Sequence, residues 1–208
     1  MVAAPPGGCP ACGKRAELCV CVAIRPVETR TEVLILQHPQ EPDRELGSAR
    51  LAQLCLPRSS LKVGLSWPNL AAALGRRARA PQWAVLYLGS SRLDPRGPQL
   101  VALSRRGKPH PDQGATLSAV TGLVALDGTW SQAKSLWWRN PWLLKLQRVA
   151  LAPRVASLYA AQRREPRVDA LSTLEALALT LSELEGRPEI MEELHRPFRK
   201  LLDRCRQR

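Results

Sequence analysis

The sequence predicts an α/β fold with a mostly parallel sheet, helices on both of its faces and a small zinc knuckle at the N-terminus. Segments typical of strands alternate with segments typical of helices, and the strand segments are apolar on both faces, as in parallel sheets. The 208 residues suit one domain with an appendage. An apolar content of 45% is sufficient for a core.

Three classes of protein are excluded by simple features of the chain. No apolar run approaches the roughly 18 residues of a transmembrane helix. Residues 1–8 lack the basic and apolar regions of a secretory signal. Six cysteines are too few for a disulfide scaffold of this length. We therefore expect a cytoplasmic protein.

The first half of the chain predicts two strands and one helix. Residues 32–38 form a short apolar run that ends before Pro39, and residues 83–88 form a second such run. Residues 46–56 have helical spacing of apolar side chains and end before Pro57. Residues 89–116 are rich in Gly, Pro and Arg, which predicts a long surface loop.

The second half predicts five elements. The helix over 172–185 has Ser172 or Thr173 as its cap and Gly186 as its stop, whereas the last helix is basic and interrupted near Pro197. The expected elements are strands over 122–126 and 149–151, and helices over 131–138, 172–185 and 191–206.

Four cysteines near the N-terminus have the spacing of a zinc site. Cys9, Cys12, Cys19 and Cys21 form the pattern CxxC, six residues, CxC. Four thiolates so close in sequence can complete a tetrahedral shell, which leaves no open position and indicates a structural metal. Disulfides are the competing interpretation, and they are less compatible with a cytoplasmic chain. We expect residues 1–28 to form this knuckle and residues 29–208 to form the α/β domain. Cys55 is expected in the core, and no role is assigned to Cys205.

The charge of the chain indicates a polyanionic partner. There are 31 basic and 18 acidic residues, which gives a net charge of +13 and a pI near 10.4. Such an excess favours RNA or DNA; a genomic bias toward Arg is the alternative. Aromatic residues make up only 4% of the chain, which argues against a platform of many stacking rings. Four tryptophans are either core residues or a base-stacking surface, with core expected: Trp67, Trp137, Trp138 and Trp142.

Polar side chains follow three of the predicted strands. Ligands bind beyond the carboxyl ends of parallel strands, so residues 38–41, 88–91 and 127–130 are candidate site segments. No GxGxxG or P-loop follows a strand, which argues against familiar nucleotide sites. For residues 127–130, a helix cap with Trp130 in the core is the alternative. His110 and His195 are expected to be solvated.

Five motifs in a fixed order resemble the DTW-domain family over residues 9–184. They are the cysteine pattern, HPxE at 38–41, DxTW at 127–130, RxxP at 163–166 and LSTLEA at 171–176. One departure concerns the aromatic residue that precedes RxxP in the family: Ala160 stands at the aligned position and Tyr159 one residue before it, so no role is carried over to Tyr159.

The resemblance implies a fold related to the SPOUT class, with a knotted C-terminal part that binds S-adenosylmethionine. It also implies transfer of the 3-amino-3-carboxypropyl group of this co-substrate to N3 of a tRNA uridine, with release of methylthioadenosine. The implied partner is tRNA, and the cysteine spacing adds a structural Zn²⁺. We expect a monomer, with a dimer as the alternative. An RNA methyltransferase of the same fold, or a zinc-knuckle protein that binds nucleic acid without catalysis, are the alternative functions.

The resemblance and the strand ends together give a set of candidate site residues. Asp127 is the expected base that removes the uridine N3 proton, and Thr129 and Trp130 complete the catalytic motif. Small residues at strand ends and the start of the helix at 172 are expected to bind S-adenosylmethionine. The expected co-substrate residues are Leu86, Leu88, Gly89, Leu126, Gly128, Arg163, Leu171, Ser172, Thr173 and Glu175. The expected RNA-binding residues are His38, Glu41, Arg76 and Arg77.

Overall fold

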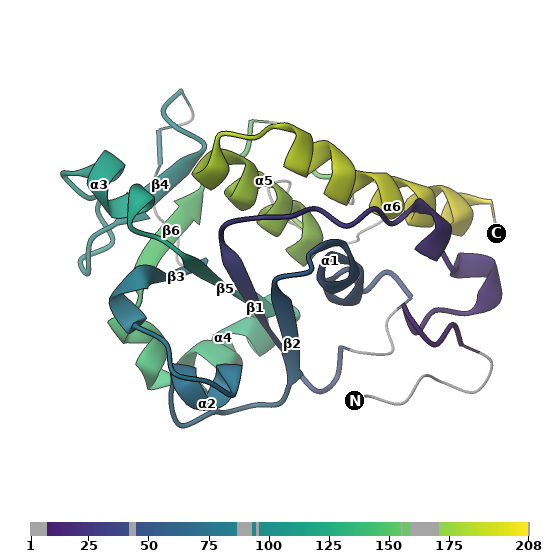
Figure 1. The fold of residues 1–208 in the computed structure, drawn as a ribbon, viewed down its shortest axis with the longest axis horizontal. Coiled ribbons are helices and arrows are strands. Elements are labelled where there is room, and N and C mark those ends of the chain that lie inside the picture. Colours follow the sequence, from purple (N-terminus) through teal and green to yellow (C-terminus); the bar gives the residue numbers. More distant parts are fainter. Residues whose placement is uncertain are drawn as a thin grey trace.

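A mostly parallel sheet forms the centre of the protein (Figure 1). The computed structural model describes residues 8–41, 45–86, 93–94, 96–154, 156–158 and 171–207. Within these residues the sheet has six strands in the order β2-β1-β5-β3-β6-β4, of which β4 alone pairs antiparallel. The strands are β1 (Glu32–Gln37), β2 (Ser59–Val63), β3 (Trp83–Leu86), β4 (Leu100–Leu103), β5 (Gly122–Asp127) and β6 (Gln147–Leu151).

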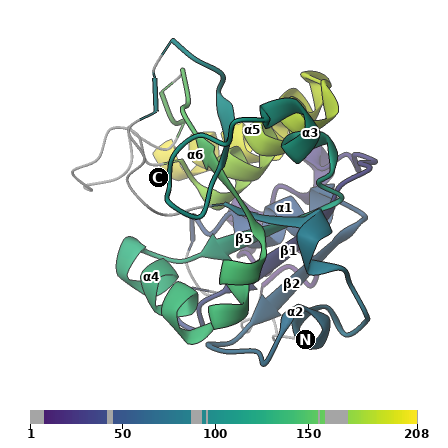
Figure 2. The same cartoon turned by 90° about the vertical axis from the view of Figure 1, so that its left-hand side faces the viewer.

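Both faces of the sheet are covered by helices, which confirms the predicted α/β class with a mostly parallel sheet and helices on both faces (Figure 2). Alternate side chains of a strand point to opposite faces. Val33 and Ile35 of β1 therefore pack with one set of helices, and Leu34 and Leu36 pack with the other. The first face carries α1 (Ala49–Cys55), α5 (Thr173–Glu185) and α6 (Glu189–Arg206), and the second carries α2 (Leu70–Leu74) and α4 (Trp130–Arg139).

The prediction of a long loop over residues 89–116 was wrong for part of this segment. Its described residues include β4 and the helix α3 (Gln113–Ser118). Four apolar residues inside a Gly- and Pro-rich stretch give too short a signal, and β4 forms because β6 offers it an antiparallel partner. The edge strand β2 was also not predicted, because three of its five residues are polar and only Leu61 and Val63 are apolar.

The last helix does not break at Pro197, contrary to the prediction. α6 continues through Pro197, although a proline in a helix costs about 3 kcal/mol. Burial of Leu194, Phe198 and Leu201 against α5 offsets this cost, since each buried side chain contributes roughly 1.5–3 kcal/mol. His195 lies on the same helix and is buried, so the prediction that it is solvated was wrong.

Other expected elements agree with the structure. β1, α4, β5, β6 and α5 lie where the sequence predicts them, and Ser172 and Gly186 cap α5. β3 is described as far as Leu86. His110 is half-buried, with Nδ1 2.9 Å from Oγ1 of Thr116. No helix among the described residues has both the length and the apolar composition to cross a membrane.

The cysteine segment packs on the α/β body. Leu18 and Val20 belong to the core that α1, α5 and α6 share. The ammonium of Lys14 donates to the carbonyls of Glu45 (2.6 Å) and Gly47 (3.0 Å), just before α1. A common core thus joins this segment to the body. The division into a cysteine segment (1–28) and an α/β domain (29–208) stays a prediction.

Gly122 allows the indole of Trp83 to lie against β5, and this close approach can be tested. A Cβ at position 122 would overlap the ring of Trp83. We expect Gly122→Ala to lower the free energy of unfolding by about 2 kcal/mol or more, because a well-packed core resists added volume. Urea denaturation measures the change. Gly114→Ala, in α3, is the matched control, since its nearest neighbour would lie 4.0 Å away. Equal stability of the two variants would contradict the packing described.

Candidate functional site

The register between β1 and β5 brings two polar side chains together at the carboxyl end of the sheet. Gln37 and Asp127 are the last residues of their strands and stand opposite each other. Asp127 continues the alternation of Leu123 and Ala125, so its side chain points toward the face that α5 covers. Nε2 of Gln37 donates to Oδ2 of Asp127 at 2.9 Å.

A helix start completes the orientation of the Asp127 carboxylate. The hydroxyl of Thr173, the first residue of α5, donates to Oδ1 of Asp127 at 2.5 Å. The two donors come from different elements and hold one oxygen each. Asp127 is 7% exposed, so the carboxylate is held in one orientation and largely shielded from water.

The turn from β5 into α4 explains the next three residues of the DxTW motif. A Cβ on Gly128 would lie 2.9 Å from Cβ of Gln132 and 3.4 Å from Cβ of His38, so the backbone passes too closely for a side chain. Thr129 caps α4 in a capping box with Gln132. Trp130 is 37% exposed and lies outside the core. The alternative interpretation therefore holds only for Thr129, which is a helix cap.

The start of α5 is held by residues from two connections, the one before α1 and the one between β6 and α5. Glu175 lies in the first turn of α5, and its carboxylate accepts from the backbone N–H of Ser172 (2.9 Å) and Leu158 (2.6 Å). The hydroxyl of Ser157 donates to both of its oxygens, at 3.0 and 2.9 Å. The hydroxyl of Ser48 accepts from the N–H of Leu174 at 3.2 Å. Glu175 thus fixes the position of the helix start that carries Thr173.

The HPxE motif lies next to Asp127 through its backbone. The N–H of His38 donates to the carbonyl of Asp127 at 2.9 Å, and the N–H of Glu41 donates to the carbonyl of His38 at 3.0 Å. Nδ1 of His38 accepts from the N–H of Gln40 at 3.3 Å. His38 is half-buried and Glu41 is buried. The local hydrogen bond of His38 fits a structural role, and contact with RNA stays a prediction for both.

The structure brings most of the predicted site residues to one edge of the sheet and leaves others elsewhere. Leu86, Leu126, Leu171 and Ser172 lie at strand ends or at the start of α5, the same edge as Asp127. Arg76 forms an ion pair with Glu32, the first residue of β1, and so lies with Arg77 toward the opposite edge. Leu88, Gly89, Tyr159, Ala160 and Arg163 lie outside the described residues.

Three residues of the site were missed. Gln37 orients Asp127, while Ser48 and Ser157 hold the start of α5. For Gln37 a signal existed, namely a polar side chain that ends an otherwise apolar strand. Ser48 and Ser157 gave none, because their partners lie far away in sequence.

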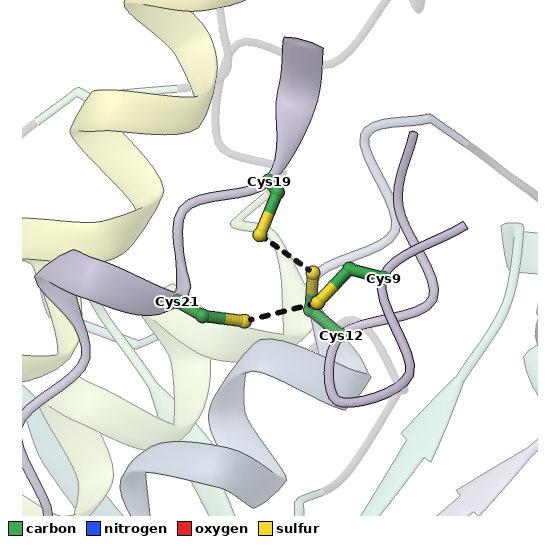
Figure 3. Close-up of side chains that lie close together, drawn as sticks. All are labelled: Cys9, Cys12, Cys19 and Cys21. Atoms are coloured by element: carbon green, nitrogen blue, oxygen red, sulfur yellow. Dashed lines mark hydrogen bonds between the residues drawn. The ribbon is translucent and has the colours of Figure 1, made fainter. Parts of the chain in front are cut away.

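The four N-terminal cysteines converge as the spacing predicted (Figure 3). Their sulfur atoms all lie within 4.8 Å of one another. The distance from Cys9 Sγ to Cys21 Sγ is 3.7 Å, and that from Cys12 Sγ to Cys19 Sγ is 3.9 Å. A tetrahedral zinc with Zn–S bonds of about 2.3 Å requires sulfur separations of about 3.8 Å. The cluster therefore has the geometry to bind Zn²⁺.

The electrostatics of the cluster also favour a cation. The backbone N–H groups of Cys12 and Ala11 lower the pKa of the Cys9 thiol to about 6, so this sulfur is a thiolate at neutral pH. Burial raises the pKa of Cys12 and that of Cys21. Four thiolates this close together repel one another, so they coexist only with a positive charge among them, and a bound divalent cation supplies it.

The model of the DTW-domain family matches residues 7–206 of the chain. This chain belongs to the DTW-domain family. The match includes both the cysteine cluster and the edge of the sheet around Asp127, so the expected resemblance is confirmed. No solved structure gives a significant match.

Curated relatives carry a specific name. The chain is 34% identical to tRNA-uridine aminocarboxypropyltransferase 2 of Drosophila melanogaster and 31% identical to the Mus musculus protein of the same name. Each match covers 93% of this chain. It covers 72% of the fly protein and 61% of the mouse protein, so part of each relative has no counterpart here.

The cysteine cluster predicts a metal requirement for stability. We expect the purified protein to bind about one Zn²⁺ per chain, and Cys19→Ser to lose it, with a melting temperature lower by more than about 5 °C. Metal analysis and thermal denaturation measure both effects. Cys205→Ser is the matched control, because Cys205 lies outside the cluster. Full stability of the wild-type protein after complete chelation would contradict the role.

Proposed function

We propose that this protein is a tRNA-uridine aminocarboxypropyltransferase. In this reaction the 3-amino-3-carboxypropyl group of S-adenosylmethionine moves to N3 of a tRNA uridine, and methylthioadenosine leaves. The observation that carries the proposal is the oriented carboxylate of Asp127 at the carboxyl edge of a parallel sheet, in a chain whose relatives bear this name over 93% of its length. The knotted threading of SPOUT proteins is part of the proposal; residues 159–170, between β6 and α5, lie outside the described part of the chain.

The proposed chemistry assigns Asp127 the role of general base. Uridine N3 carries a proton and becomes a good nucleophile only when that proton leaves. Asp127 accepts the proton as N3 attacks the γ-carbon of the amino-acid arm. A bond forms between N3 and this carbon while the bond from carbon to sulfur breaks. The electron pair of that bond stays on sulfur, which neutralises the sulfonium.

Gln37 and Thr173 serve this step by holding the base. A fixed carboxylate does not have to reorient when the uridine arrives, which is the advantage of a preorganised site. Both neighbours donate hydrogen bonds, and donors favour the charged form of a carboxylate. The two contacts thus fix the direction in which the carboxylate oxygens of Asp127 point.

The other site roles are proposed from position. Leu86, Leu126, Gly128, Leu171 and Ser172 lie at strand ends or at the start of α5, where main chain is available to bind S-adenosylmethionine. The positive end of α5 favours the carboxylate of the amino-acid arm. The same roles are proposed for Leu88, Gly89 and Arg163.

The cellular setting is proposed from the cysteines and the surface. Six cysteines are free thiols, which is compatible with the reducing cytoplasm. In the described part of the chain, few large apolar side chains are exposed: Val22, Leu65, Trp130, Trp138 and Leu144. Because these give little apolar surface for a second copy, we propose a monomer.

Replacement of the base separates catalysis from folding. Asn at position 127 keeps both contacts, because its carbonyl accepts from Gln37 and its amide donates to the Thr173 oxygen. We therefore expect Asp127→Asn to keep its melting temperature and to lose about 10²- to 10⁴-fold in rate. Asp203→Asn, an exposed aspartate on α6, is the matched control. Mass spectrometry of the tRNA nucleosides measures the product. Full activity of Asp127→Asn would remove the role, and S-adenosylhomocysteine as by-product would indicate a methyltransferase instead.

The basic charge predicts a strong effect of salt on tRNA binding. With a net charge of +13, we expect the affinity for tRNA to fall about tenfold or more between roughly 50 and 200 mM salt. The affinity for S-adenosylmethionine serves as the internal control, because a small ligand neutralises few charges. Fluorescence anisotropy with labelled tRNA measures the first affinity, and calorimetry measures the second. A flat response of the tRNA affinity would contradict phosphate contacts.

A further inference from the structure

The structure separates the four tryptophans whose roles the sequence left open. Trp142 is buried, and its indole N–H donates to the carbonyl of Trp67 at 2.9 Å. Trp67 and Trp137 pack against the core below α4. Trp138 is 78% exposed and does not contribute to that core. Burial of apolar area explains the first three residues and does not explain Trp138.

Trp138 belongs to a stripe on one face of α4. Trp130, Lys134 and Trp138 are spaced four residues apart, and residues at this spacing lie on the same face of a helix. All three are exposed. We call this set the α4 stripe. It begins three residues after Asp127, on the face of the sheet opposite to the one toward which the Asp127 side chain points. Its two indoles are separated by about 12 Å along the helix axis.

The surroundings of the stripe are basic. α4 contains Lys134 and Arg139 and no acidic residue. The guanidinium of Arg148 lies 5.8 Å from the ring centre of Trp137 and donates to the carbonyl of Arg105 at 3.1 Å. The C-terminal part of α4 is therefore connected through Arg148 to the turn after β4.

Further cations lie toward the edge of the sheet opposite Asp127. Arg105 and Arg106 are exposed in the turn after β4. Arg76 and Arg77 follow α2, which lies on the same face of the sheet as α4 (Figure 2). The positive charge lies where an aromatic side chain is also exposed, which is the combination that single-stranded nucleic acid requires.

We propose that the α4 stripe binds single-stranded nucleotides of the tRNA next to the target uridine. A base stacks on the indole of Trp138, and Lys134 contacts a phosphate between the two tryptophans. The stripe is long enough for roughly three to four stacked nucleotides at ~3.4 Å each. This inference rests on the proposed function, because it takes the uridine at Asp127 as the point from which the strand continues.

The chemistry of the stripe favours an unpaired strand over a duplex. Bases in an A-form helix are stacked on one another, and their faces do not reach a protein side chain. Unpaired loop bases have exposed faces and stack on aromatic rings with little sequence preference. Lys134 between the indoles interrupts the apolar surface, which suits a phosphate backbone better than an apolar protein partner.

Substitutions on α4 test the stripe directly. We expect Trp138→Ala to weaken tRNA binding about tenfold and to raise the KM for tRNA by a similar factor, with kcat little changed. Trp138→Phe should restore most of the affinity because it keeps an aromatic face. Lys134→Ala should lower the slope of log affinity against log salt by about one. Leu144→Ala is the matched control, since Leu144 is also apolar and exposed on the neighbouring segment.

The outcomes distinguish this inference from the proposed function. If Trp138→Ala binds tRNA as tightly as the wild-type protein while both modify it, the stripe is wrong and the transferase stands. If the wild-type protein modifies no uridine yet Trp138→Ala binds RNA more weakly, the transferase is wrong. The stripe then stands as a surface for single strands, and its placement next to a target uridine is wrong. If the protein bound RNA hairpin loops and blunt RNA duplexes with equal affinity, the preference for single strands would also be wrong.

Discussion

The edge of the sheet around Asp127 depends, in this DTW protein, on the parallel pairing of β1 with β5. This pairing places Gln37 opposite Asp127, and both side chains point to the face that α5 covers. A shift of one residue would turn Asp127 to the other face, away from Thr173. The buried residues of both strands oppose such a shift, because they fill a separate core on each side of the sheet. The core and the site therefore specify the same register.

Two polar side chains at the start of α5 have different roles: one contacts Asp127, and the other holds the helix start in place. Thr173 contacts Asp127, whereas Glu175, two residues later, holds the loops that lead to this point. Glu175 is buried and accepts from backbone and hydroxyl donors, as a buried carboxylate must. The Glu175 carboxylate thus fixes the position of Thr173, and with it the contact to Asp127, without touching Asp127 itself.

Much of this arrangement follows from the sequence, and the remainder depends on distant contacts. β1 and β5 were predicted because apolar runs on both faces identify central strands, and the site edge followed from where those strands end. β2 and β4 were missed because edge strands are short or polar. Gln37 was missed as the partner of Asp127 because 90 residues separate them. Likewise, Arg76 was grouped with the site, although its pairing with Glu32 puts it toward the other edge. The exposure of Trp138 was not predictable either, since Trp137 beside it is packed.

The cysteine segment is connected through hydrogen bonds to the start of α5, which contacts Asp127. Lys14 grips the carbonyls of Glu45 and Gly47, and the next residue, Ser48, meets the N–H of Leu174 beside Thr173. Burial lowers the pKa of Lys14, and the two carbonyls offset the loss of water around its ammonium. The cysteine segment is therefore linked, through Lys14 and Ser48, to the start of α5. A change in the cysteine cluster would therefore reach the start of α5 and the orientation of the Asp127 carboxylate, at a distance from the sulfur atoms themselves.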